Sequence, residues 1–395
     1  MRVLLLTGKG GVGKTTTAAA TAALAASRGL RVLVLSTDVA HSLADALQVP
    51  LAATPVQVRD GLHAMQVDGQ AAFERSWRDI QNYLLAVLER AGVDALQAEE
   101  LTVLPGAEEV LALLEVKRQA DSGRWDVIVV DCAPTGETLR LLALPEALQR
   151  YVDKIFPAQR RALKALRPLM SRINGPAIPA DALFAAVERL HRELGEVRAL
   201  LTSPQASVRL VLTPEAVVVA EARRTLTSLA LYGYRVDGLV ANRVFPATVG
   251  DPFVQGWVAA QGAQLEAIGR DAAPLPVLVA PYCHAEPVGL TALVALGQAL
   301  YGEDDPVAAV APTGDLVQVA PTEDGFVLSL ALPLARREDL DLARSGDELV
   351  VTVAGHRRVI ALPSALRRCL VAGATLSEGR LAISFTPDPA LWMRA

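Results

Sequence analysis

The segment Leu4–Ala20, LLLTGKGGVGKTTTAAA, decides the fold of most of this chain. A leucine run leads into a glycine-rich turn and then into an alanine-rich helical stretch, and Gly8–Thr15 match the pattern GxxxxGK[ST] in the strand-to-helix context that defines a phosphate loop. Glycines let backbone N–H groups face phosphate oxygens, and the helix N-terminus adds partial positive charge. We expect Lys14 to reach the β- and γ-phosphates of ATP and Thr15 to ligate Mg²⁺. The residues expected to bind the nucleotide in this loop are Gly8, Lys9, Gly10, Gly11, Val12, Gly13, Lys14, Thr15 and Thr16.

Up to about Gly302 the sequence alternates short β-branched runs with Ala/Leu-rich stretches. Several runs are apolar on both faces, as in a sheet covered by helices on each side. The pattern predicts a doubly wound α/β domain with a mostly parallel sheet, and ligands then lie at the carboxyl ends of the strands. The expected strands are Arg2–Thr7, Arg31–Ser36, Leu62–Val67, Trp125–Asp131, Arg209–Thr213, Val236–Asn242 and Leu275–Ala280.

Two aspartates end predicted strands beside this loop. Asp38 follows the second strand, where its carboxylate can orient or deprotonate an attacking water, and a helix N-cap role is the alternative. Asp131 ends the run VIVVD and matches the Walker B aspartate that holds Mg²⁺. We expect Mg²⁺ to be held by Thr15 and, through water, by Asp38 and Asp131. The loop Cys132–Gly136 is a candidate switch that senses the γ-phosphate.

The base pocket is assigned to the ends of the last two predicted strands. Asn242 carries a donor and an acceptor that can pair with adenine. The loop Ala280–Pro287 includes Pro281 and Tyr282, which can contact the base or ribose. An ordinary structural role for these residues stays open at this point.

Composition limits the function classes. The 395 residues carry a net charge of −5, which argues against a general electrostatic grip on nucleic acid. The three cysteines are scattered, so neither a disulfide framework nor a CxxC knuckle is expected. The phosphate loop begins too early to leave room for a cleavable signal, and the apolar runs are too short for a membrane span. We expect a soluble, cytoplasmic protein with at most peripheral membrane contact.

Three further regions differ from the rest of the chain in composition and in the spacing of their apolar residues. Residues 71–120 and 151–207 are predicted to be helical insertions in an ATPase domain of residues 1–302, and ordinary packing layers are the alternative. A Pro/Ala/acidic stretch, residues 303–313, is expected to be a linker. Residues 314–395 contain runs such as FVLSLALP, GDELVVTVAG and GRLAISFTP, which predict an all-β sandwich.

The motifs GKGGVGKTT, STDVAHSLADAL, DCAPTGETLRLLALP and GLVANRVFP occur in the order found in arsenite-pump and tail-anchored-protein-targeting ATPases. The chain resembles that family, a part of the deviant Walker A class, over residues 1 to about 302. The tail DGFVLSLALPLARREDLDLARSGDELVVTV is similar to the α-crystallin domain of small heat-shock proteins, which marks a bacterial and plastid branch of the targeting ATPases.

The resemblance implies an ATP-hydrolysing homodimer with ATP at its interface. It implies that Lys9 crosses to the partner's phosphates, that Asp38 positions the water and that Asn242 reads adenine. The catalytic set is then Asp38, Lys9 and Lys14. In the targeting branch the helical insertions form a groove for a hydrophobic client helix or apolar cargo. This sequence departs from the family pattern at Val39 and Glu137, and it lacks the zinc-binding CxxC.

Three other functions stay open at this level. A partitioning or septum-positioning ATPase usually carries a basic patch or a basic amphipathic C-terminal helix, whereas here the tail is a β domain. An arsenite-transport ATPase needs clustered thiols for a soft metalloid. A holdase acting mainly through the C-terminal domain is the third, although Lys14, Thr15, Asp38 and Asp131 argue against decay of the ATPase site.

Overall fold

Strand β1 (Arg2–Thr7), formed by the run RVLLLT, lies inside an eight-stranded sheet. It pairs in parallel with β5 (Val127–Asp131) on one side and with β6 (Ala206–Leu212) on the other. The carboxyl end of β1 is therefore the point from which the chain winds in both directions, which is where ligands bind in this class of fold. The structure is a computed structural model and describes residues 1–38, 42–67, 107–133, 180–248, 250–308 and 316–392.

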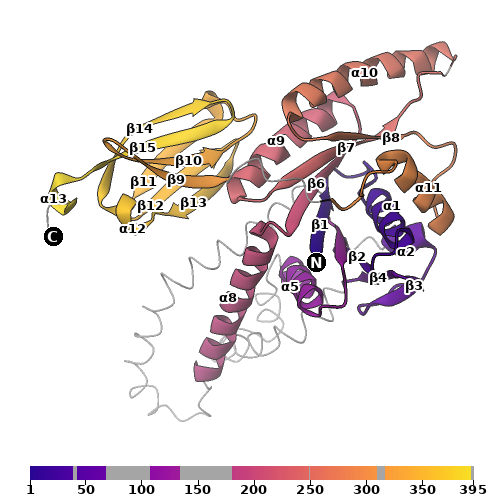
Figure 1. Cartoon of the computed structure of the whole chain (residues 1–395), viewed down its shortest axis with the longest axis horizontal. Coiled ribbons are helices and arrows are strands. Elements are labelled where there is room, and N and C mark those ends of the chain that lie inside the picture. The colour runs from indigo at the N-terminus through magenta and orange to yellow at the C-terminus, as the bar shows by residue number, and fades with distance from the viewer. Residues whose placement is uncertain (39–41, 68–106, 134–179, 249, 309–315, 393–395) are drawn as a thin grey trace, which may run out of the picture.

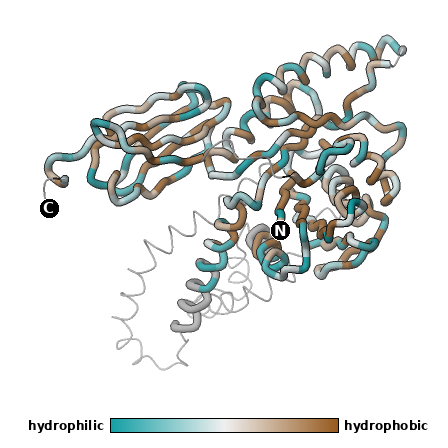
Figure 2. The backbone as a smooth tube through the Cα atoms, in the orientation of Figure 1, coloured by the Kyte–Doolittle hydropathy of each residue, from teal (hydrophilic) through white to brown (hydrophobic). Residues whose placement is uncertain are grey.

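The sheet has the order β3-β4-β2-β5-β1-β6-β7-β8, and its neighbouring strands are parallel except for β3 and β4. This confirms the predicted doubly wound α/β fold. The central strands are buried along their length, and Figure 2 shows hydrophobic residues concentrated along them. The remaining strands are β2 (Val32–Ser36), β3 (Val56–Arg59), β4 (Leu62–Gln66), β7 (Val236–Val244) and β8 (Val277–Pro281).

The strand predictions were wrong in two places. Strand β3 was missed because VQVR is short and pairs only with β4 at the sheet edge, where its side chains alternate between half-buried and exposed. Residues Ala206 and Ser207, assigned to a helical insertion, already belong to the fully buried strand β6. A polar and proline-containing turn, Ser203–Gln205, ends the helical pattern just before them.

The helices cover the sheet. Helix α1 buries most of its alanine-rich length and packs against α11, where Gly297 lies so close that an added Cβ would stand 2.9 Å from the Ala20 carbonyl oxygen. Along the described parts of the chain, no helix is long and apolar enough to cross a membrane. The helices of this domain are α1 (Lys14–Ser27), α2 (Ser42–Leu47), α5 (Ala107–Asp121), α8 (Ala180–Thr202), α9 (Ala216–Tyr232), α10 (Pro252–Ala272) and α11 (Leu290–Tyr301).

The two expected helical insertions are described only in part. Helices α5 and α8 are their described portions and pack against each other, and α8 runs away from the sheet in Figure 1. Residues 71–106 and 151–179 lie outside the described residues, as do residues 309–313 of the expected linker.

The C-terminal strands form a separate small β domain of two antiparallel sheets, ordered β14-β15-β10-β9 and β11-β12-β13. Its core includes Leu328, Val351 and Phe385, all almost fully buried. The expected all-β sandwich is confirmed. Its strands are β9 (Val317–Thr322), β10 (Gly325–Ala331), β11 (Leu340–Ser345), β12 (Glu348–Val353), β13 (His356–Ala361), β14 (Cys369–Ser377) and β15 (Arg380–Pro387), with short helices α12 (Ser364–Arg367) and α13 (Pro389–Trp392).

Helix α9 joins the two parts of the molecule. Its residue Leu231 is 1% exposed and belongs to the hydrophobic core of the β sandwich. The Thr227 hydroxyl donates to the Pro333 carbonyl at 2.6 Å, and the buried guanidinium of Arg358 donates to the Leu231 carbonyl. Helix α9, which also lines a cleft beside the phosphate loop, therefore contributes to the docking of the β domain on the ATPase domain.

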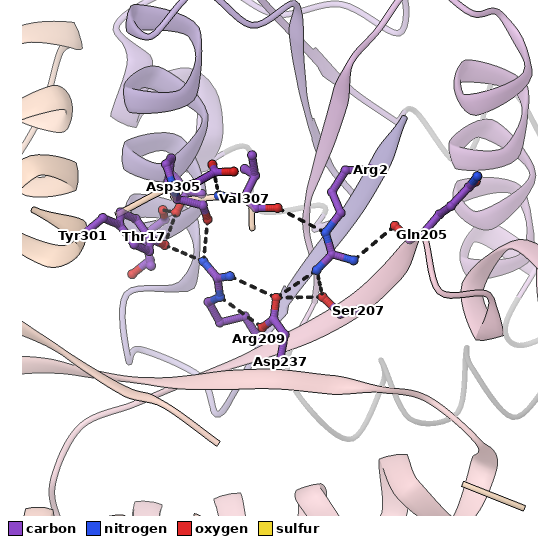
Figure 3. Close-up of polar contacts among 11 residues, drawn as sticks. Arg2, Thr17, Gln205, Ser207, Arg209, Asp237, Tyr301, Asp305 and Val307 are labelled. Atoms are coloured by element: carbon purple, nitrogen blue, oxygen red, sulfur yellow. Dashed lines mark hydrogen bonds and ion pairs between the residues drawn. The ribbon is translucent and has the colours of Figure 1, made fainter. Parts of the chain in front are cut away.

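A buried ionic cluster fastens the end of α11 to the sheet, away from the carboxyl ends of the strands (Figure 3). Asp237 accepts hydrogen bonds from both Arg209 and Arg2, and Arg209 Nη1 also donates to the Pro306 carbonyl at 2.8 Å. The Tyr301 hydroxyl bridges this cluster to Thr21 of α1 at 2.7 Å. The segment that leads toward the β domain is thus anchored in the interior.

Candidate nucleotide site

The glycine-rich loop between β1 and α1 takes a conformation that its glycines make possible. Gly13 has φ 90°, in the left-handed region, and an added Cβ would stand 2.3 Å from Asn242 Nδ2. Gly8 lies against the backbone of β6, where a Cβ would stand 2.0 Å from the Val211 carbonyl oxygen. These two positions therefore require glycine for different reasons, one for space and conformation together and the other for space alone.

The loop presents the N-terminus of α1 and a buried lysine. Helix α1 begins with Gly13 as its cap and no side-chain hydrogen bond at that cap, so the first N–H groups are open to an anion. Lys14 is only 7% exposed, and its Nζ donates to the Lys9 carbonyl at 3.2 Å. Thr15 and Thr16 follow it in the first turn of the helix and are half-buried. This arrangement matches what a phosphate loop needs.

Asp131 lies at the carboxyl end of β5, fully buried beside the loop. Burial raises the pKa of its carboxyl to about 6, against the opposing influence of the Thr15 hydroxyl, the Lys14 ammonium and the Ser36 hydroxyl. Ser36 Oγ donates to Oδ2 at 3.3 Å, while Oδ1 has no hydrogen-bond partner among the described residues. A buried carboxylate oxygen without a partner is costly, which indicates a ligand in the functional state.

Asp38 follows β2, the strand next to β5 in the sheet. Its backbone N–H donates to Ser36 Oγ at 3.2 Å, and its carbonyl accepts from Gln66 Nε2 at 3.3 Å. The negative charge of Asp38 also raises the pKa of Asp131, and the register that pairs Ser36 with Asp131 places Asp38 just beyond this pair. The structure thus brings together two aspartates that lie far apart in the sequence.

The donor set fits Mg²⁺. Mg²⁺ prefers oxygen ligands and keeps several waters when a protein supplies only a few carboxylates. The unpartnered Oδ1 of Asp131, the Asp38 carboxylate and the Thr15 hydroxyl at the start of α1 supply such ligands. Ser36 supports this set by hydrogen-bonding to both aspartates, a role that was not expected. Its place as the last residue of β2, two residues before Asp38, is the signal that would have identified it.

Lys9 points to the other side of the loop. Its Nζ lies 3.8 Å from Glu221 Oε2 of α9, and both side chains are partly exposed. A shallow cleft between the loop and α9 is lined by Gly8, Lys9, Val218, Glu221 and Thr225. The two lysines of the loop therefore differ in burial, because Lys14 is buried whereas the Lys9 side chain is partly exposed.

The residues expected at the base lie at the carboxyl ends of β7 and β8. Asn242 is almost buried, and its Nδ2 donates to the Val12 carbonyl at 2.8 Å, so one amide hydrogen remains for a ligand. Pro281 ends β8, and the exposed ring of Tyr282 follows it. The Phe245 ring stacks on Tyr282 with centroids 4.8 Å apart and planes inclined by 9°. Phe245 was missed because nothing in the sequence pairs it with Tyr282.

The switch loops are described only at their first residues. Cys132 is buried, and burial raises the pKa of its thiol, so it acts as a small core residue. Val39, Gly136 and Glu137 lie outside the described residues.

Comparisons with known proteins identify the family of the chain. A family described as anion-transporting ATPase matches residues 1–302, and an HSP20-like domain found in ArsA proteins matches residues 323–385. A Streptomyces coelicolor protein is 40% identical over 100% of both chains. A putative arsenical pump-driving ATPase of Chlorobaculum tepidum is 34% identical over 98% of this chain and 96% of its own. The ATPase ASNA1 homolog of Cryptosporidium parvum is 32% identical over 62% of this chain and 66% of its own.

The chain belongs to the ArsA family of anion-transporting ATPases and carries the HSP20-like domain associated with it. It is therefore an enzyme that binds and hydrolyses ATP.

Proposed function

We propose that this ATPase works as a homodimer in which ATP closes two copies around their phosphate loops and so forms a site for a hydrophobic client helix or other apolar cargo. The observation that carries the proposal is the meeting of Lys14, Asp38 and the partly unpartnered Asp131 at the carboxyl ends of adjacent parallel strands. Such a site is suited to binding a nucleoside triphosphate and to hydrolysing its γ-phosphate.

The chemistry follows from the positions of the side chains. Asp38 accepts a hydrogen bond from a water and aligns it for attack on the γ-phosphorus, while the bond from that phosphorus to the β–γ bridging oxygen breaks. Lys14 and the open N–H groups of α1 stabilise the charge on the phosphate oxygens. Mg²⁺, when bound by Thr15 and through water by Asp38 and Asp131, supplies further charge neutralisation. Asn242 reads adenine with its remaining amide hydrogen, beside Pro281 and Tyr282.

The dimer is proposed from the position of Lys9. Its side chain is 40% exposed and pairs weakly with Glu221, so it is available to a second molecule. The resemblance to deviant Walker A ATPases supports a role in which Lys9 contacts the partner's phosphates, in the manner of an arginine finger supplied in trans.

The client site is proposed for the helical regions that flank the sheet. Helix α8 has 23 residues, and the last part of its length packs Leu194, Val197 and Leu201 into the core. Its amino-terminal part carries apolar residues at helical spacing in the sequence DALFAAVERL. A helix of this length that leaves the sheet supports a groove formed when two copies close.

The names of several relatives refer to an arsenical pump, and the cysteines weigh against that function here. Cys132 lies in the core of the ATPase domain, whereas Cys369 lies in the core of the β sandwich. Cys283 follows β8. Three thiols placed in this way do not form, within one chain, the soft cluster that a trivalent metalloid needs.

The test uses full-length Asp38→Asn. We expect this variant to bind ATP, to lose at least about 100-fold in turnover because the water is no longer aligned, and to sediment as a dimer with ATP. A photoreactive leucine-rich peptide of about 20 residues, long enough to span a membrane as a helix, should crosslink to the ATP-bound dimer and not to the ADP-bound protein. Unchanged turnover would refute the role of Asp38, and crosslinking independent of nucleotide would refute the client site.

Lys9→Ala separates the dimer from nucleotide binding. We expect ADP affinity to stay within about threefold of the wild type, since one exposed contact is lost, while hydrolysis falls strongly. Strong loss of ADP binding by the monomer would show that Lys9 acts within its own subunit.

A further inference from the structure

Strand β7 contains a bulge at the nucleotide site. Ala241 pairs with Val279 of β8 and Val244 pairs with Pro281, so Asn242 and Arg243 together oppose the single residue Ala280. A bulge of this kind turns side chains out of their regular alternation, and such bulges gather near active sites. Both bulged side chains point toward the phosphate loop, because each forms a hydrogen bond with it.

Arg243 is held in an uncommon backbone conformation. Its φ is 58°, in the left-handed region, which a residue with a long side chain enters only when its surroundings enforce it. Buried Gln261 of α10 enforces it here, since its Nε2 donates to the Arg243 carbonyl at 3.1 Å and its Oε1 accepts from the Phe245 N–H at 2.8 Å. The Arg243 N–H donates to Asn242 Oδ1 at 2.9 Å. The backbone N–H and the carbonyl of Arg243 are thus both engaged.

The result of this anchoring is a pair of contacts to consecutive carbonyls of the phosphate loop. Arg243 Nη1 donates to the Gly11 carbonyl at 3.0 Å, and Asn242 Nδ2 donates to the Val12 carbonyl at 2.8 Å. Gly11 and Gly13 are in the left-handed region, the conformation in which successive N–H groups can converge on an anion. Holding the carbonyls toward β7 keeps these N–H groups directed to the phosphate.

We propose that Arg243 is a positioning residue that holds the phosphate loop in its nucleotide-binding conformation before ATP arrives, and that Gln261 sets its backbone for this purpose. A loop already in its binding conformation loses less conformational freedom when ATP binds, so its benefit is a lower Kd and KM. Ground state and transition state gain equally from such an effect, so kcat is unaffected.

The experiment compares full-length Arg243→Ala, Arg243→Lys and Arg243→Gly with the wild type. We measure kcat and KM for ATP with Mg²⁺, and Kd for ADP by calorimetry. Loss of one charge-assisted hydrogen bond predicts a rise of about tenfold in KM and Kd for the alanine variant, with kcat within about twofold. Lysine should recover most of the loss, since it restores a donor.

The glycine variant separates side chain from backbone. Glycine removes the strain at φ 58°, so the Tm of the glycine variant should be higher than that of the alanine variant. The KM for ATP should nevertheless rise equally in the two variants, because both lack the guanidinium. Arg270→Ala is the matched control. It removes an exposed charge in the last turn of α10 and should leave the KM for ATP unchanged. Unaltered KM and Kd in the alanine variant, or a fall in kcat at constant KM, would overturn the proposal.

Discussion

Arg209 donates two hydrogen bonds to Asp237, from Nε to Oδ1 at 3.1 Å and from Nη2 to Oδ2 at 2.9 Å (Figure 3). Asp237 lies in the sheet and is only 2% exposed. The same carboxylate also forms an ion pair with Arg2, whose Nη2 lies 3.1 Å from Asp237 Oδ2. One buried anion therefore pairs with two cations, and the two arginines in turn donate to carbonyls of the segment that follows α11.

Removing this anion should be costly. Asp237→Ala leaves two guanidinium groups in the interior without their carboxylate, and we expect the free energy of unfolding in urea to fall by about 3–5 kcal/mol. Glu338→Ala breaks the exposed pair with Arg336 and should change it by less than about 1 kcal/mol. Equal effects of the two substitutions would show that the buried pair is not a major source of stability.

Two glycines of the phosphate loop should respond differently to alanine. At Gly8 the new Cβ would meet the Val211 carbonyl oxygen at 2.0 Å, whereas at Gly10 no atom lies within 4 Å. We expect Gly8→Ala to lower stability by about 1–3 kcal/mol, because β6 or the loop must move, and to impair ATP binding. Gly10→Ala should leave the thermal midpoint nearly unchanged. Calorimetric unfolding without nucleotide makes the comparison, and similar midpoints for both variants would contradict it.

The pair Arg31–Asp126 gives the prediction for pH. Side-chain hydrogen bonds from Arg31 lower the pKa of Asp126 from 3.8 to about 2. A carboxyl whose pKa is lower in the folded state stabilises the fold above its unfolded pKa, near pH 4, and that contribution disappears as the pH falls toward 2. Arg31→Gln should return the pKa of Asp126 toward 3.8, measured by NMR titration of the carboxyl carbon. Because the Arg31 side chain is 59% exposed and that of Asp126 is 38% exposed, solvent screens the pair and the effect on stability should be small.

Docking of the β domain should depend on Leu231. Truncating this helix α9 side chain removes apolar contacts from the sandwich core, and we expect Leu231→Ala to cost about 2–5 kcal/mol. Unfolding should then separate into two calorimetric transitions, because the joint between the domains is weakened before either core is. Val217→Ala, at a position 68% exposed on the same helix, is the control and should keep the wild-type profile. A single unshifted transition in Leu231→Ala would show that the docking rests on other contacts.

The sequence by itself determined the local elements and the chemistry of the phosphate site. The fully apolar runs predicted a covered parallel sheet, and Gly8–Thr15 predicted a phosphate loop, because both depend on backbone and side-chain properties of neighbouring residues. The places of Asp38 and Asp131 at the carboxyl ends of neighbouring strands were also predicted from the sequence, since strand ends mark the edge of a parallel sheet where ligands lie.

Only the tertiary structure decided which distant residues support that site. The bulge opposite Ala280 turns Arg243 to the Gly11 carbonyl, and Gln261 lies 18 positions beyond Arg243 on another element. The Phe245–Tyr282 stack and the burial of Leu231 in the β sandwich depend in the same way on how separate elements pack. No periodicity or motif encodes such contacts, because their energy comes from burial and geometry that exist only after the chain has folded.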